Sequence, residues 1–285
     1  MHGGKVTMKM NKKALKGLLR ERRDLIEPAD HGLTRPSGPG RRAAGLSQQQ
    51  VDELTGRKPN TYYRLESGQY SNPPVDYLCD LGRLFGLNEQ EWGSLCRYAG
   101  IGEPPFPLNP ASGLEVPGVW QEAVDGISHM AYVNDASWNL LAHNGPFAEL
   151  FPDGRVPQNT MRWMLLDPLA RGMLLDWETV WAPLVLPQLR AALSVRSDDQ
   201  TLLQIAREAQ DDPVLSQLWE SGGAHIHPDG DERPIHHAVH GPGHVTMCAS
   251  EPLGSPGARL IFLIFHPGTQ KQHTRLPMLR ARRTT

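Results

Sequence analysis

Two short amphipathic segments joined by a glycine-containing turn constrain the fold of this chain more than any other feature. The first segment opens at Ser47, and Gln50 follows three residues later, which is the spacing of a capping box. Gly56 ends this segment, and Pro59 is expected to be the first helical residue of the second, which stops at Gly68. Two short helices around a turn of about three residues predict a helix-turn-helix.

Three further helices are predicted around this pair. Apolar side chains recur at helical spacing over residues 14–26, 75–85 and 88–99. Pro28 ends the first of these helices, and Asn88 is placed to cap the last one. The first hundred residues are therefore expected to form an all-α domain of five helices.

Charge is unevenly distributed along the chain, although the formal net charge is only −2. Residues 1–70 carry 14 Lys and Arg against 7 Asp and Glu, whereas residues 71–285 carry 15 against 24. A basic head (residues 1–70) and an acidic body (residues 71–285) indicate that the head binds a polyanion and the body does not. A solvated basic face without a partner would give the same balance, so charge alone leaves both interpretations open.

The rest of the chain predicts an α+β domain, because short strand patterns stand on both sides of a long helical pattern. The helical pattern covers about residues 160–220, where Pro183 and Pro187 are expected to kink or split it. Short helices are expected at 118–128 and 145–151. The expected strands lie at 130–135, 136–144, 233–240, 243–250 and 258–266. The last of them is almost entirely apolar, which predicts a central, buried strand.

The head resembles the Cro/repressor-type (XRE) helix-turn-helix family in the motifs LLRERRDLIEP, GLSQQQVDELTG and YYRLESGQ. The resemblance implies that the start of the second helix enters the major groove, where base edges differ. Asn can pair with adenine and Arg or Lys with guanine, whereas Pro59 cannot read a base in this way. Glu66 is expected to pair with Arg20 or Arg23. The DNA-contacting residues implied are Arg41, Arg42, Gln48, Lys58, Asn60, Thr61 and Arg64.

The body resembles the MmyB-type ligand-binding domain, a PAS-like domain of actinobacterial regulators. The resemblance rests on YVNDASWNLLAHNGPFAELF, MRWMLLDPLARGMLLDWETVWAPL, RPIHHAVHGPGHVTM and RLIFLIFHPGT. It implies an elongated apolar ligand of fatty-acid type, with Asn144 and Arg162 as polar anchors for its head group. The ligand-contacting residues implied are Trp138, Leu140, Asn144, Phe147, Phe151, Arg162, Trp163 and Trp181. Any of these aromatic residues could instead belong to an ordinary core.

Six histidines crowd into the segment from His225 to His244. Such a cluster is compatible with zinc or copper binding or with a pH switch, and also with plain exposed polar residues. In a strand, His236 and His237 would point to opposite faces, so one site could not use both simply.

Taken together, these patterns predict a cytoplasmic, dimeric, DNA-binding transcriptional regulator that responds to an amphiphilic ligand and lacks enzymatic activity, a resident cofactor and a membrane segment. Control of secondary metabolism is the expected role. A metal- or pH-responsive regulator and an adaptor with a degenerate helix-turn-helix stay open as alternatives. The expected organisation is a disordered N-terminus (1–13), the helix-turn-helix domain (14–100), a Pro-rich linker (101–115), the PAS-like domain (116–270) and a basic tail (271–285).

Overall fold

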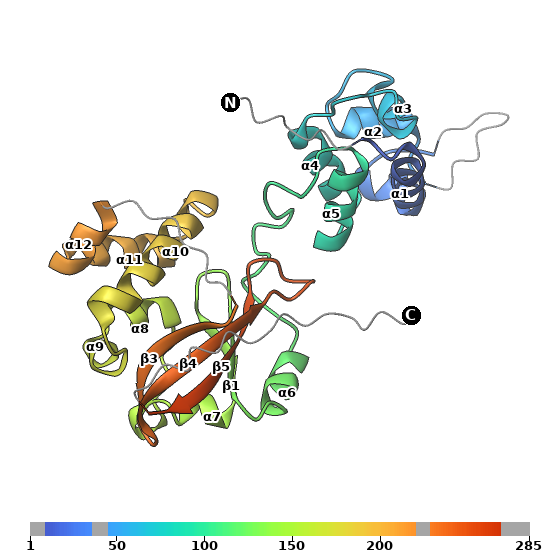
Figure 1. Ribbon diagram of the computed structural model, residues 1–285. Coiled ribbons are helices and arrows are strands. Elements are labelled where there is room, and N and C mark those ends of the chain that lie inside the picture. The colour runs from blue at the N-terminus through green and yellow to red at the C-terminus, as the bar shows by residue number, and fades with distance from the viewer. Residues whose placement is uncertain (1–8, 36–44, 221–228, 269–285) are drawn as a thin grey trace, which may run out of the picture. The chain divides into compact units, whose positions relative to one another are not determined.

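The computed structural model describes residues 9–35, 45–220 and 229–268 of the 285 in the chain. The chain divides into two compact units, Met1–Ser112 and Gly113–Thr285. The first unit is helical, and the second combines helices with a five-stranded sheet (Figure 1). This confirms the expected sequence of an all-α domain followed by an α+β domain.

The first unit is a bundle of short helices around one apolar core. The core includes Leu15, Leu19, Leu65 and Trp92, each of which is fully buried or nearly so. The unit contains α1 (Lys12–Leu25), a 3-10 helix η1 (Pro28–His31), α2 (Gln48–Leu54), α3 (Thr61–Glu66), α4 (Val75–Leu84) and α5 (Glu89–Tyr98). Helix α1 begins inside the stretch that was expected to be disordered, because the Asn11 side chain caps it by accepting from the Ala14 amide.

Capping of α5 follows the prediction. The Asn88 side chain accepts from the Glu91 amide at 2.9 Å, and the Glu91 carboxylate accepts from the Asn88 amide at 3.0 Å. This reciprocal pair satisfies two amides that a helix start otherwise leaves without partners.

The second unit is built on a wholly antiparallel sheet with strand order β2-β1-β5-β4-β3. Its strands are β1 (Met130–Asn134), β2 (Leu140–His143), β3 (Asp231–His237), β4 (Gly241–Ser250) and β5 (Arg259–Pro267). The apolar last strand, β5, is central between β1 and β4, as its sequence predicts.

Side chains of β1 alternate between two cores on opposite faces of the sheet. Met130 and Tyr132 belong to the larger core, and Ala131 and Val133 belong to the smaller one, where Val124 of α6 (Val119–Asp125) packs. The larger core receives side chains from α7 (Gly145–Ala148), α8 (Thr160–Leu166), α9 (Pro168–Met173), the π-helix η3 (Trp177–Trp181), α10 (Ala182–Val195), α11 (Gln200–Asp211) and α12 (Pro213–Glu220). The 3-10 helix η2 (Pro152–Gly154) has no buried residue.

The predicted long helical region is divided into several helices, and Pro187 does not split it but lies buried within α10. Pro183 follows directly on the change from the π-helix η3 to α10 at Ala182. New helices begin where Asp167, Asp199 and Asp212 cap them. Among the described residues, no helix is both long and apolar enough to cross a membrane.

Candidate DNA-contacting surface and ligand site

The α2–α3 pair has the predicted capping box and a different turn from the predicted one. The Ser47 hydroxyl accepts from the Gln50 amide, and the Gln50 side chain accepts from the Ser47 amide. Helix α3 begins at Thr61, so the prediction that Pro59 is its first helical residue is wrong. Asn60 precedes the helix in the left-handed region, with φ of 69°. Asn tolerates this conformation better than most side chains do.

A carboxylate from α2 takes the place of the missing cap on α3. Asp52 is buried, and its Oδ1 accepts from the Tyr62 amide at 2.7 Å. The Tyr62 hydroxyl in turn donates to the Leu19 carbonyl of α1 at 3.0 Å, and burial raises the pKa of this phenol. Helix α3 is thereby fixed to both α1 and α2.

A buried ion pair adds a second tie between α1 and α3. Arg23 Nε donates to Glu66 Oε2 at 3.3 Å, and Arg23 Nη1 donates to the Leu46 carbonyl at 2.5 Å. Both charged side chains are buried. Of the two arginines expected for Glu66, Arg23 is the partner, whereas Arg20 lies near Asp24.

The outer side of α3 and the turn before it carry four of the predicted DNA-contacting residues, and a fifth, Gln48, is the first residue of α2. Lys58, Asn60 and Arg64 are exposed, and Thr61 and Gln48 are partly exposed. Arg41 and Arg42 lie outside the described residues. The same face exposes Tyr63 to 46%, a residue outside the predicted DNA-contacting set. The inward spacing of Tyr62, Leu65 and Glu66 could have indicated it, because residue 63 then points outward.

In the body, three of the predicted aromatic residues, Phe147, Phe151 and Trp163, contact one another in a row that begins at Tyr132. The Phe147 ring centroid lies 4.4 Å from that of Tyr132 and 5.1 Å from that of Phe151, which lies 5.1 Å from that of Trp163. Trp138, Phe147, Phe151 and Trp181 are buried, whereas Leu140 and Trp163 are partly buried against the same core.

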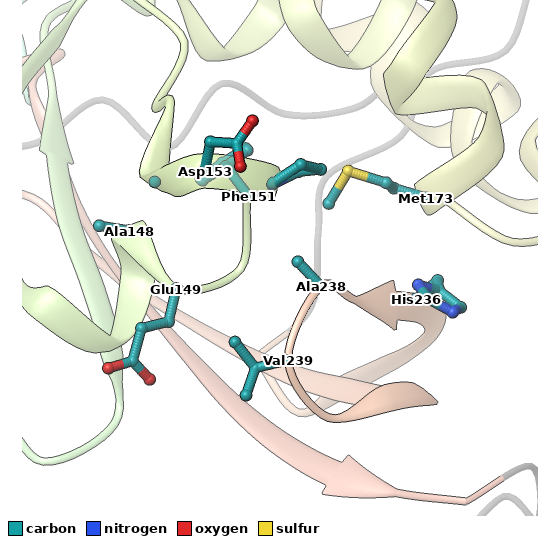
Figure 2. Close-up of a pocket in the computed structure, with 10 residues that line it drawn as sticks. Ala148, Glu149, Phe151, Asp153, Met173, His236, Ala238 and Val239 are labelled. Carbon is teal, nitrogen blue, oxygen red and sulfur yellow. The ribbon is translucent and has the colours of Figure 1, made fainter.

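Phe151, which lies within this row, also lines an open groove of about 610 Å³. Figure 2 shows Phe151 and Met173 on one side of it and Ala238 and Val239 on the other. Phe151 is the predicted ligand-contacting residue among those that line the groove.

The two predicted polar anchors are engaged elsewhere. The Asn144 side chain is buried and caps α7, with all of its hydrogen bonds going to the backbone. Arg162 makes a two-pronged ion pair with Glu208 of α11, and its side chain is 45% exposed. Neither residue lines the groove.

The histidine segment is only partly described, because His225 and His227 lie outside the described residues. His236 is exposed and His237 is buried, so the predicted opposite orientation is confirmed. His237 Nδ1 accepts from the amides of Val239 and His240, and burial, followed by the nearby His240, lowers the pKa of His237. Within the described part of the chain, no group of three His, Cys, Asp or Glu residues could hold a metal ion.

Comparison with known families matches both units. A family described as MmyB-like transcription regulator ligand binding domain matches residues 117–279, which is more than half of the chain. A helix-turn-helix domain family matches residues 38–95. No curated protein matches the sequence significantly.

Proposed function

The chain belongs to the MmyB-like transcription regulators, and from this membership we propose that it binds its operator as a dimer through α3 and alters that binding when a fatty-acid-like amphiphile occupies the body. It is a DNA-binding transcriptional regulator with a ligand-binding domain. We further propose that the protein is not an enzyme, that it is located in the cytoplasm and that it controls secondary metabolism.

The observation that carries the DNA-binding part is the rigidly supported outer face of α3. Asp52 and the Arg23–Glu66 pair fix the helix from inside, while Asn60 and Arg64 are left exposed. Preorganised Asn and Arg side chains suit two-pronged contacts to adenine and guanine in the major groove. Lys58 and Thr61 extend this face.

Phosphate contacts are assigned to Gln48, Arg41 and Arg42. Gln48 is the first residue of α2 and is partly exposed, and the two arginines belong to the basic head. Such contacts release counterions, so operator affinity should fall steeply as salt rises. Half-sites of a dimer should lie about one or two helical turns apart.

Replacement of Asn60 tests base reading. The Asn60→Gly variant removes the amide and keeps the positive φ without strain, so it should weaken binding to the preferred site by about 1–3 kcal/mol and change random-DNA binding little. Asn60→Ala should lose the same contact and also strain the turn. Fluorescence anisotropy with both DNAs measures this effect. An equal loss on both DNAs would mean that Asn60 contacts only the backbone.

The ligand part of the proposal rests on the aromatic row and the groove beside it. Apolar walls with a few polar groups are typical of small-molecule sites. Trp138, Phe147, Phe151, Trp163 and Trp181 are assigned to the walls, together with Leu140. Asn144 and Arg162 have protein partners, which leaves the head group to be placed by other residues.

A titration of the full-length protein tests ligand sensing. Dodecanoic acid at about a hundred times its dissociation constant should raise the free energy of unfolding by about 2.7 kcal/mol and should also change operator affinity. Thermal unfolding and anisotropy with the chain's own upstream DNA provide the two readouts. If fatty acids of graded length leave both readouts unchanged in delipidated protein, the sensing proposal fails. A response to Zn²⁺ or to pH instead would favour the histidine alternative.

A further inference from the structure

Tyr70 lies where the chain turns back after α3, and its ring contacts the side chain of Arg64. The Arg64 guanidinium lies 5.3 Å from the centroid of the Tyr70 ring. Arg64 is exposed on the outer side of α3, whereas Tyr70 is partly buried against the core of the first unit. Because a guanidinium is attracted to the face of an aromatic ring, this contact favours one orientation of the Arg64 side chain.

The backbone after α3 brings the Tyr70 ring back to Arg64. Gly68 has φ of 70°, which lets the chain reverse at the end of the helix. The amides of Gln69 and Tyr70 then both donate to the Arg64 carbonyl, at 2.7 and 3.1 Å. Tyr70 is thereby tied to the same residue that its ring contacts.

A second tyrosine supports the Tyr70 ring from the interior. The Tyr77 ring centroid lies 6.4 Å from that of Tyr70, and Tyr77 is buried in α4. The Arg57 guanidinium lies 4.9 Å from the Tyr77 ring centroid. Arg57 itself donates to the carboxylates of Asp76 and Asp80, at 3.0 and 2.9 Å. The ring of Tyr70 therefore rests on side chains that have fixed partners of their own.

The guanidinium of Arg64 is held by a ring and not by a carboxylate. Other arginines of the first unit, namely Arg22, Arg23, Arg57 and Arg97, each pair with a carboxylate. Among the residues that the structure describes, the Arg64 guanidinium has neither an ion-pair partner nor a hydrogen-bond acceptor. The ring contact occupies the face of the guanidinium and leaves its N–H edge available to an acceptor.

A guanidinium held in this way suits the paired acceptors of guanine. Guanine presents O6 and N7 in the major groove, and Arg can donate to both at once. A side chain that is already oriented loses less conformational freedom when it binds. A phosphate contact carries no sequence information and requires no such alignment with a base edge. The support from Tyr70 therefore favours base reading by Arg64 over a phosphate contact.

We propose that Tyr70 is a positioning residue, which orients the Arg64 guanidinium so that it reads a guanine of the operator. The inference rests on the proposed DNA-binding function and deepens it, because it adds a residue outside the α2–α3 pair to the determinants of specificity. Without the Tyr70 ring, Arg64 keeps its charge but discriminates less sharply between guanine and the other bases.

Discrimination at one base pair is a readout that a merely structural role would not move. A duplex selected from a random pool by the full-length wild-type protein is varied one base pair at a time, and fluorescence anisotropy gives the affinities. The wild type should prefer one G·C pair by about ten- to a hundredfold, and Arg64→Ala should not. Tyr70→Leu should reduce this preference by about two- to fivefold, and Tyr70→Phe, which keeps the ring, should retain it. Binding to random DNA and its salt dependence should stay unchanged in both Tyr70 variants.

Two comparisons separate positioning from stability. Tyr98→Leu removes another partly buried tyrosine that packs against the same core, and it should keep the preference. In an Arg64→Ala background, Tyr70→Leu should cause no further loss, because the two residues act through one contact.

A measurement on the wild type keeps the test decisive if Tyr70→Leu folds poorly by circular dichroism. In NMR spectra of the arginine-labelled wild-type and Tyr70→Phe proteins, the Arg64 δ protons should show an upfield ring-current shift. Their signals are identified by their loss in Arg64→Lys.

Equal losses on selected and random DNA in Tyr70→Leu, the same loss in Tyr70→Phe, or unshifted Arg64 protons would overturn the proposal. A selected site without a G·C pair that depends on Arg64 would overturn it too. In each of these cases the wild type still prefers its selected site, so the DNA-binding function stands. If the wild type shows no preference among duplexes, the DNA-binding function fails as well.

Discussion

Glu66→Ala is expected to unfold the DNA-binding head or to leave it close to unfolding, with a loss of about 3–5 kcal/mol. The Glu66 carboxylate is the buried partner of Arg23, so its removal leaves the buried guanidinium with only the partly exposed Asp24 carboxylate, 3.3 Å from Arg23 Nη1, as its counter-charge. Arg23 also holds the Leu46 carbonyl just before α2, so the disturbance should reach the helix pair. Domains are typically stable by about 5–15 kcal/mol, of which this loss is a large part.

Urea unfolding of the full-length protein measures this loss. Hydrogen exchange should be read over residues 45–112, so that the signal belongs to the first unit. Specific DNA binding should disappear together with protection of these amides. Glu53→Ala, at an exposed position of α2, is the control and should change stability by less than about 0.5 kcal/mol. A Glu66→Ala protein as stable as this control would show that the ion pair does not hold the helices together.

Capping and turn residues made the α2–α3 helix pair predictable, whereas the first residue of α3 depends on a contact between residues ten positions apart. Ser47, Gln50 and Gly56 act within a few residues of themselves, so their effects can be read from the sequence. The start of α3 depends instead on Asp52, which reaches the Tyr62 amide across the turn. That carboxylate allows the helix to begin without a cap of its own at Thr61.

Strand composition made the centre of the sheet predictable, whereas the ion-pair partner of Arg162 could not be predicted because it lies far away in the sequence. The apolar run of β5 indicates a buried strand wherever its partners come from. Arg162 stands in a family motif, yet its partner Glu208 lies 46 residues away on another helix.

Asn144→Ala is expected to destabilise the body by about 3 kcal/mol or more, because one buried amide satisfies four backbone groups. Its Oδ1 accepts from the amides of Ala131 and Phe147, both at 3.0 Å. Its Nδ2 donates to the carbonyls of Ile127 and His129 at 2.9 and 2.7 Å. The side chain thus ties the start of α7 to β1 and to the segment before it, and Ala leaves these groups without a partner.

The Asn144→Asp variant separates the hydrogen bonds that the side chain accepts from those that it donates. Its carboxylate can still accept from the two amides but cannot donate to the two carbonyls, so the loss should lie between the wild type and Asn144→Ala. Thermal unfolding of the ligand-free protein gives the ranking, and titration with dodecanoic acid gives the affinity. Because Phe147 belongs to the aromatic row, displacement of α7 should weaken the acid and 1-dodecanol alike. An Asn144→Ala protein that keeps its stability and loses only the acid would mean that the amide binds the head group directly.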